Sequence, residues 1–216
     1  MSAEPELEGR IAFITGAAHG QGRSIALKLA AAGADIAAFD VAAKIEYPGY
    51  GQGTPEELQT LQAEIEALGR RALVFTGDVR DAAAVDAAVA ETVAQLDGLD
   101  ILLNNAGIVA YAAADEMTEL EWDSMIDINR KGPFLVGRAA IPHLKASPHA
   151  VIVNNSSVMG LRGGNRLSHY VASKHGLTGL TKAWAIELAP HGVRVVSIHP
   201  TGATQPLNAG RAAPAG

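Results

Sequence analysis

A short apolar segment near the start of the chain runs directly into a glycine-rich turn. Residues 10–15 (Arg-Ile-Ala-Phe-Ile-Thr) read as a buried strand, and a helical pattern covers residues 23–32. Three glycines lie in the turn between them: Gly16, Gly20 and Gly22. Glycine lets the backbone approach a pyrophosphate at the positive end of a helix, so this order of strand, turn and helix predicts a dinucleotide site.

Asp40 ends the second predicted strand, residues 35–39. An acidic residue at this position is placed to bind the hydroxyls of an adenosine ribose. It would repel the 2′-phosphate of NADP, and no arginine lies in the glycine turn or just after Asp40 to bind that phosphate. The pattern therefore predicts NAD as the cofactor. Two alternatives stay open. Lys44 is a nearby cation that could bind the 2′-phosphate of NADP, and Asp40 could simply end the strand or cap a turn without binding ribose.

Short apolar runs alternate with helical patterns along the chain. This alternation predicts one α/β domain, a Rossmann-like doubly wound parallel sheet with right-handed crossovers and helices on both faces. The predicted strands are residues 10–15, 35–39, 71–76, 99–103, 150–154 and 194–198, and the predicted helices are residues 23–32, 55–68, 81–96, 119–144 and 168–189. We assign residues 9–207 to this domain and expect residues 1–8 and 208–216 to be disordered ends.

Two segments depart from regular elements. Residues 42–54 form a loop longer than the roughly 2 to 6 residues that usually join elements in such folds, and loops of this length are often functional. Within the helix of residues 119–144, Gly132 and Pro133 interrupt the pattern, and proline is tolerated only in the first turn of a helix. We therefore expect a kink near Asn129.

The composition excludes several classes of function. The chain has 216 residues, a formal net charge of −6 and no basic run, so we expect no nucleic-acid partner. It has no cysteine, which excludes disulfides and thiolate chemistry and is typical of a reducing cytosol. The seven histidines are scattered without ligand spacing, so we expect no metal and interpret them as structural or surface residues. No apolar run is long enough to span a bilayer, and the acidic N-terminus is unlike a signal peptide; we therefore expect a cytoplasmic protein.

Tyr170 and Lys174 are the strongest candidates for chemistry beyond the glycine turn. Residues four apart on a helix share a face, so the phenol and the ammonium can point into the same space. A phenol normally titrates near ~10, and a cation held beside it favours the phenolate and brings the hydroxyl closer to neutral pH. Taken alone, such a pair is more often a chance spacing on a surface helix, so its significance depends on the rest of the chain.

The remaining short motifs follow one another in a fixed order. They are Thr15-Gly16-x-x-x-Gly20-x-Gly22, Asp78-Val79, Asn104-Asn105-Ala106-Gly107, Asn129, Ser157, Tyr170-x-x-x-Lys174 and Pro200-x-Gly202. In this combination, with Ser157 thirteen positions before Tyr170, the chain resembles a short-chain dehydrogenase/reductase over residues 9–202. The resemblance implies an NAD-dependent oxidoreductase that interconverts a secondary alcohol and a ketone by hydride transfer.

The same resemblance implies a role for each motif residue. Tyr170 is the general acid/base, Lys174 binds the nicotinamide ribose and favours the phenolate, Ser157 binds the substrate oxygen, and Asn129 holds a water that links Lys174 to solvent. The implied cofactor-binding residues are Gly16, Gly20, Gln21, Gly22, Asp40, Asp78, Val79, Asn105, Ala106, Gly107, Tyr170, Lys174, Pro200 and Gly202. We interpret Ser156 as support for the strand end, and Met125, Ile126 and Met159 as core residues.

A narrower resemblance concerns three segments: residues 11–16, the loop with Lys44-Ile-Glu-Tyr-Pro, and Tyr170-Val-Ala-Ser-Lys-His-Gly. Together they are similar to the carveol-dehydrogenase-like, mycofactocin-coupled group. In that group the inserted loop accompanies NAD that exchanges poorly, and the electrons leave through an external redox carrier. The resemblance implies a small hydrophobic secondary alcohol or ketone as substrate.

The last residues depart from the family pattern. Family members continue past the turn at Pro200 into a helical segment over the substrate, a seventh strand and a final helix, whereas this chain reaches Leu207 and ends in residues rich in Ala, Gly and Pro. This composition resembles a truncated or frame-shifted terminus. We expect the seventh strand, which serves the homo-oligomers of the full-length family, to be missing, which leaves the sixth strand unpaired and lowers stability.

Two other functions stay open at this point. The first is a catalytically impaired NAD-binding remnant that lacks the substrate lid. The second is a sugar-nucleotide epimerase or dehydratase, which also uses a tyrosine and a lysine four apart but usually has a different glycine spacing and a longer substrate domain.

Overall fold

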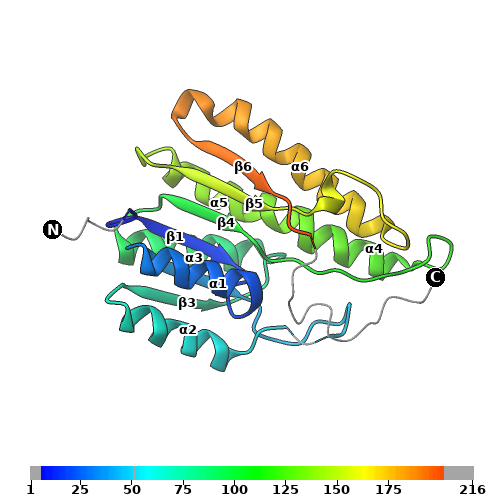
Figure 1. Cartoon of the computed structure of the whole chain (residues 1–216), viewed down its shortest axis with the longest axis horizontal. Helices are drawn as coiled ribbons and strands as arrows, with labels where there is room; N and C mark the ends of the chain where they lie inside the picture. The colour runs from blue at the N-terminus through cyan, green and yellow to red at the C-terminus, as the bar shows by residue number, and fades with distance from the viewer. Residues whose placement is uncertain (1–5, 51, 202–216) are drawn as a thin grey trace.

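A parallel sheet runs through the centre of the molecule, and helices cover both of its faces (Figure 1). The structure is a computed structural model that describes residues 6–50 and 52–201. Its strands are β1 (Ile11–Thr15), β2 (Asp35–Asp40), β3 (Ala72–Thr76), β4 (Ile101–Asn104), β5 (Val151–Asn155) and β6 (Arg194–Ile198). They lie in the order β3-β2-β1-β4-β5-β6, and every neighbouring pair is parallel. This confirms the predicted Rossmann-like α/β sheet.

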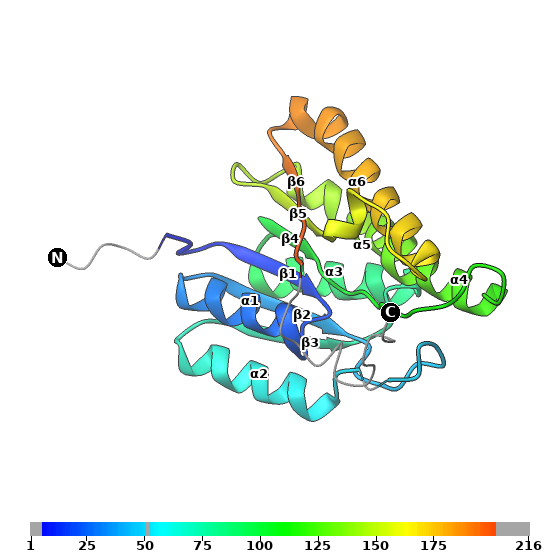
Figure 2. The same ribbon diagram turned by 45° about the vertical axis from the view of Figure 1, so that its right-hand side comes forward.

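The helices form two layers. They are α1 (Gly20–Ala31), α2 (Pro55–Ala67), α3 (Ala82–Leu96), α4 (Glu119–Ile126), α5 (Gly132–Leu144) and α6 (Ser168–Leu188), with a π-helical turn η1 (Asp127–Lys131) and two 3₁₀ turns, η2 (Val158–Gly160) and η3 (Ala189–His191). Helices α1 and α2 pack together on one face of the sheet, and α3, α5 and α6 cover the other face (Figures 1 and 2).

The burial of each strand follows from its place in the sheet. All side chains of β1 and β2 are buried, because helices cover these central strands on both faces, and both sequences are correspondingly almost continuous apolar runs. In the edge strand β6, by contrast, only Val195 is buried, Ser197 is half-buried and the other three residues are exposed. Among residues 6–50 and 52–201, no strand pairs with the outer edge of β6, and Val196 and Ile198 remain 47% and 37% exposed.

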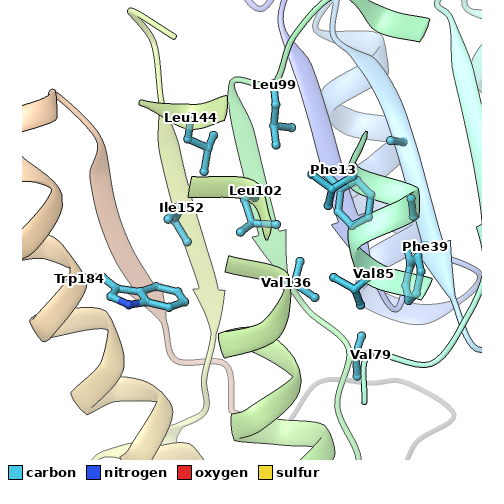
Figure 3. Packing of buried hydrophobic residues seen from close by; sticks show 14 of the residues in the cluster. Phe13, Phe39, Val79, Val85, Leu99, Leu102, Val136, Leu144, Ile152 and Trp184 are labelled. Carbon is cyan, nitrogen blue, oxygen red and sulfur yellow. The ribbon is translucent and has the colours of Figure 1, made fainter. Parts of the chain in front are cut away.

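The larger of two hydrophobic clusters lies between the sheet and helices α3, α5 and α6 (Figure 3). Phe13, Leu102 and Ile152 contribute from three neighbouring strands, and Trp184 of α6 packs beside Ile152 in the same layer. The smaller cluster fills the space under α1 and α2. Because both faces of the central strands are packed, the carboxyl ends of these strands are held in fixed positions.

The chain reverses its direction across the sheet between β3 and β4. It first moves outward from β1 to β2 and β3, then returns to the other side of β1 and continues through β4 to β6. The loops after β1 and β4 therefore diverge and leave a crevice at their carboxyl ends, which is where open parallel sheets bind ligands.

Two helices differ from the sequence-based prediction. Helix α1 begins at Gly20 rather than at residue 23, because the second half of the glycine turn already forms the first helical turn. The predicted kink near Asn129 is a π-helical turn, in which the N–H of Gly132 bonds to the carbonyl of Asp127, five residues earlier. Pro133 follows in the first turn of α5, where its missing N–H is tolerated.

Candidate active site

A cleft lies at the carboxyl ends of β1 and β4, in the predicted crevice. Most of the predicted site residues line it: Gly16, Gly20, Gln21, Asp40, Asp78, Val79, Asn105, Ala106, Gly107, Ser157, Tyr170, Lys174 and Pro200. Gly22 and Asn129 are buried next to this lining, and Gly202 lies outside the described residues. The fold thus brings residues from six separate motifs to one surface.

The glycine turn supports a close approach of the backbone to a ligand. Gly16 and Gly20 have φ angles of 65° and 61°, in the left-handed region that favours glycine. A side chain on Gly22 would lie 2.0 Å from the carbonyl oxygen of Gly16, so only glycine fits there. Within the described residues no side chain caps the N-terminus of α1 and no acidic residue lies in its first turn. The positive end of this helix is therefore available to an anion.

Asp40 occupies the position expected for a residue that binds ribose, but it also shapes the loops around it. Its two carboxylate oxygens accept hydrogen bonds from the backbone N–H groups of Ala18 and Ala42, both at 3.0 Å, and its side chain is 4% exposed. The alternative role as a turn cap is therefore present in the structure, alongside its position on the cleft wall. One carboxylate fixes the glycine turn and the start of loop 42–54.

Side-chain amides connect the glycine turn to the opposite wall of the cleft. The Asn105 amide donates to the carbonyl oxygen of Gly16 at 2.9 Å and accepts from the Asn155 amide at 2.8 Å. The Asn155 amide also donates to the side-chain oxygen of Gln21 at 2.8 Å. These bonds link the segment after β4 to β5 and α1 across the floor of the cleft. They therefore fix the position of the glycine turn relative to the end of β5.

Tyr170 and Lys174 lie on the same face of α6, as predicted, and both line the cleft. The ammonium nitrogen of Lys174 is 5.8 Å from the centre of the Tyr170 ring. It donates a hydrogen bond to the backbone oxygen of Asn155 at 2.7 Å. Lys174 is only 5% exposed, and this burial lowers its pKa from 10.5 to about 8. The lysine can therefore change its charge in a range close to neutral pH.

The pKa of Tyr170 differs from the sequence-based expectation. We expected the Lys174 cation to lower it, whereas burial of the phenol raises it above the ordinary value of 10.0. A hydrogen bond with the Ser157 side chain opposes this effect, and the nearby Tyr111 adds to it. The physical reason is that the protein walls remove the phenol from water, which favours its neutral form.

Asn129 is placed by the π-helical turn. Its amide oxygen accepts from the backbone N–H of Ile108 and its amide nitrogen donates to the Ile108 carbonyl, both at 2.8 Å. The same nitrogen lies 3.2 Å from the Ser173 hydroxyl on α6. A side chain on Gly107 would lie 3.2 Å from the Asn129 amide oxygen and 3.5 Å from the Lys174 nitrogen. Asn129 therefore fixes the segment after β4 directly beside the lysine.

Comparison with known proteins agrees with this geometry. A family profile described as short chain dehydrogenase matches residues 10–214. The (−)-trans-carveol dehydrogenase of Rhodococcus erythropolis is 44% identical over 203 residues, which cover 93% of this chain and 73% of that protein. The chain belongs to the short-chain dehydrogenase family.

Solved structures of this family resemble the chain closely. A carveol dehydrogenase from Mycobacterium avium in complex with NAD has a TM-score of 0.89 and 41% identity, and the match covers 91% of this chain and 72% of that one. A short-chain dehydrogenase from Mycobacterium paratuberculosis bound to NAD has a TM-score of 0.91 and 39% identity, with 94% and 76% covered. These matches confirm the predicted family, fold and class of NAD-dependent oxidoreductase.

Several residues of this short-chain dehydrogenase site were not predicted from the sequence. Met159 was interpreted as a core residue and His19 as a structural or surface residue, but both line the cleft. Tyr111 and Leu167 line it as well. Met159 follows the predicted strand-end serines and His19 lies inside the glycine turn, so proximity to known motifs was the available signal. No comparable signal marks Tyr111 or Leu167.

Two findings on the described residues concern metal-binding groups and membrane-spanning helices. Residues 6–50 and 52–201 contain no group of acidic and histidine side chains arranged to hold a metal ion. Within the same residues no helix is long and apolar enough to cross a membrane.

Proposed function

We propose that this chain interconverts a small hydrophobic secondary alcohol and the corresponding ketone, with NAD as hydride carrier and Tyr170 as general acid/base. The observation that carries the proposal is the convergence of Tyr170, Ser157 and Lys174 on the same cleft that the glycine turn opens into. When bound, NAD supplies the hydride acceptor at C4 of its nicotinamide ring. The protein must then orient the substrate and manage the proton.

Three features of the described residues fit a dinucleotide. The uncapped end of α1 and the left-handed backbone at Gly16 and Gly20, which line the cleft, would hold the pyrophosphate. Asp40, fixed by two backbone N–H groups, would accept hydrogen bonds from the adenosine ribose. The buried oxygen of the Asn155 amide has no hydrogen-bond partner within the described residues, so it is available to a ligand at the floor of the cleft.

The proposed proton transfer depends on the residues of α6 and η2. Ser157 contacts the Tyr170 phenol and would hold the substrate oxygen next to it, where charge develops. Tyr170 would then accept the alcohol proton during oxidation, or donate it during reduction. Lys174, held by the Asn155 carbonyl, would lie beside the phenol and stabilise the phenolate as it forms. A water held at Asn129 as the link from Lys174 to solvent remains part of this proposal.

The substrate class follows from the walls beyond Tyr170. They are mostly apolar and include Ile108, Val109, Val158, Met159 and Leu167. Such a pocket would favour a hydrophobic substrate with one polar oxygen. A relative named carveol dehydrogenase accords with a cyclic secondary alcohol. An external redox carrier, a homo-oligomeric state and a cytoplasmic location stay predictions from the sequence.

Replacement of Tyr170 by Phe tests the proposed acid/base. The Tyr170→Phe variant should lose turnover by about 10²- to 10⁴-fold, because only the proton-transferring hydroxyl is removed. NAD should remain bound, which native mass spectrometry would detect. Turnover would be measured with a panel of cyclic secondary alcohols, carveol included, and an artificial electron acceptor. Ser157→Ala should lower turnover by about 10²- to 10³-fold, again with NAD retained.

Retained turnover in Tyr170→Phe would remove this residue as the acid/base. The alternative of an impaired NAD-binding remnant makes a different prediction. In that case the parent chain itself would hold NAD but oxidise no alcohol of the panel.

A further inference from the structure

Loop 42–54 contacts both halves of the cleft. At one end, a side chain on Gly53 would lie 2.3 Å from the Ala18 side chain and 3.2 Å from the Asp40 carboxylate, so the loop packs directly against the glycine turn. Further along, the Tyr50 hydroxyl accepts a hydrogen bond from the backbone N–H of Val109 at 3.1 Å. The loop therefore extends from the cofactor side of the site to the segment that follows β4.

A third contact of this loop reaches the helix that carries Tyr170. The Tyr47 hydroxyl and the Nε2 atom of His169 are 3.0 Å apart, and the two ring centres are 6.3 Å apart. These residues are separated by 122 positions in the sequence. His169 has no exposed surface, and burial lowers its pKa, which favours the neutral imidazole. The Tyr47 hydroxyl is thus the hydrogen-bond partner of a fully buried ring next to Tyr170.

The first turn of α6 needs such support. Helix α6 begins at Ser168, so Tyr170 is its third residue. Within the described residues no side chain caps this N-terminus, and the residue at the cap position is Leu167. The first turn of a helix is where backbone N–H groups lack helical partners and where the chain frays most readily. A contact that fixes His169 therefore also fixes the backbone of Tyr170.

We propose that Tyr47 is a positioning residue for the reaction: through its hydrogen bond to His169 it holds the first turn of α6 so that the Tyr170 hydroxyl faces the substrate oxygen. The proposal rests on the proposed function for its kinetic consequence. It makes loop 42–54 a part of the catalytic apparatus, since a residue of the cofactor half of the chain orients the acid/base of the other half.

The same loop provides a matched control. Tyr47→Phe and Tyr50→Phe each delete one phenol hydroxyl that makes a long-range hydrogen bond from this loop. Only the first bond reaches α6, whereas the second reaches the backbone of Val109. A general loosening of the loop should therefore affect hydrogen exchange in both variants alike, and a specific effect on the first turn of α6 should appear in Tyr47→Phe alone. The comparison applies to hydrogen exchange and not to kcat, because the Tyr50 phenol interacts electrostatically with Tyr170.

Kinetics give the first test. Tyr47→Phe should lower kcat by roughly tenfold, the factor expected for one lost hydrogen bond, with little change in KM and in the amount of NAD bound. With a substrate deuterated at the carbinol carbon, its kinetic isotope effect should increase, because a displaced Tyr170 slows the chemical step. An unchanged kcat and isotope effect would overturn the proposal even if the melting temperature fell.

Variants of His169 test whether Tyr47 acts through this ring. His169→Leu should lower kcat as much as Tyr47→Phe, and the double variant should be no slower than either single variant. His169→Gln, which keeps a polar group near the Nε2 position, should recover part of the loss. If the fold-losses of kcat in the two single variants multiplied in the double variant, Tyr47 would not act through His169.

Hydrogen exchange provides a readout that does not depend on finding the substrate. In Tyr47→Phe the amides of residues 171–174 should exchange roughly tenfold faster than in the parent, while those of residues 180–188 should not change. Tyr50→Phe should leave residues 171–174 protected. If the parent oxidises no alcohol but this pattern appears, the proposed function fails and the positioning contact stands. If residues 171–174 stay protected in Tyr47→Phe, the positioning proposal fails regardless of turnover.

Discussion

Lys174 is held in the folded chain at a cost in stability. Its ammonium is 5% exposed and hydrogen-bonds to one backbone carbonyl, so the protein replaces little of the water that the charge loses. Burial accordingly lowers its pKa to about 8. Such a penalty accords with the role proposed for Lys174, since a functional charge is kept where an apolar residue would be more stable.

This penalty predicts a pH dependence of stability. Below pH 8 the lysine is protonated in both states and the full cost applies, whereas between about 8 and 10.5 the unfolded chain binds the extra proton, so stability rises with pH. The rise corresponds to about 3 kcal/mol. The Lys174→Met variant should not show this rise of stability with pH. At pH 7 its free energy of unfolding should exceed that of the parent by up to about 3 kcal/mol. Urea unfolding of both NAD-free proteins from pH 7 to 10.5 would measure the difference, and parallel pH curves would refute it.

Among single residues, those that belong to short motifs could be placed in the cleft from the sequence alone. Tyr170, Lys174 and Asn105 lie in the cleft because a helical spacing or a strand end places them there. Tyr47 and His169 could not be paired from the sequence, because 122 positions separate them and no periodicity relates a loop to a helix N-terminus. The pKa of Tyr170 was missed for a similar reason, since burial depends on walls contributed by the whole fold.

Among the helices, α5 and α6 show how closely two elements approach. Gly137 of α5 faces Trp184 of α6, and a side chain on this glycine would lie 2.2 Å from the indole ring. Trp184 is 6% exposed and belongs to the larger hydrophobic cluster. The absence of a side chain at Gly137 is therefore what lets the indole ring approach the backbone of α5.

Two glycine substitutions should consequently have opposite effects. Gly137→Ala should destabilise the protein by about 1–3 kcal/mol, because the indole must move within a packed core. Gly179→Ala, on α6 where no atom lies within 4 Å of the added carbon, should stabilise it by about 0.5–1 kcal/mol through helix propensity. Equilibrium unfolding in urea would measure both. Equal effects of the two substitutions would show that helix propensity, and not the Trp184 contact, governs Gly137.

Element types were predictable from hydrophobic periodicity, and their ends were less so. Strand β6 has the predicted bounds, whereas β4 begins two residues after the predicted start, although the backbone of Asp100 already bonds to Ile11 and Val151. The interruption at Gly132 and Pro133 predicted a kink, but the extra residue of a π-helical turn has no signature in apolar spacing. The bounds assigned to the whole domain, residues 9–207, stay a prediction, as does the missing seventh strand.

On the scale of the whole molecule, Asp35 connects the start of β2 to the residues that precede β3, at the end of the sheet opposite the cleft. It begins β2 and accepts hydrogen bonds from the backbone N–H of Arg71 at 2.9 Å and from the side chains of Arg70 and Arg71 at 3.1 and 2.7 Å. Burial alone would raise the pKa of this carboxyl, but the hydrogen bonds and charges of the two arginines outweigh burial and lower it. The carboxylate therefore stabilises the fold in its ionised form.

Replacement of Asp35 by Asn should reveal this contribution as acid sensitivity. Its folded pKa lies below 3.8, so the stabilisation is present above about pH 4 and is lost as the pH falls through the folded pKa. Asp35→Asn should lower the free energy of unfolding by about 2 kcal/mol at pH 7. The difference in unfolding free energy between the variant and the parent should become smaller below pH 4. Urea unfolding at pH 7, 5 and 3 would test it, and turnover per folded molecule should not change. A gap that stays constant with pH would exclude the carboxylate charge as its cause.

The contacts of loop 42–54 also constrain how genes of this family can recombine. By sequence the loop belongs to the first half of the sheet, yet Tyr47 and Tyr50 bind residues that follow β4 and begin α6. A crossover anywhere between residues 54 and 109 would pair Tyr47 with a foreign residue at position 169, whereas the backbone N–H that Tyr50 uses at position 109 is supplied by any residue except proline. Progeny of such crossovers would also combine Phe13 and Phe39 of one parent with Trp184 of the other in the larger hydrophobic cluster, and Tyr47 would lose its own partner on α6. The loop and the segments that it contacts are thus expected to be exchanged as one unit.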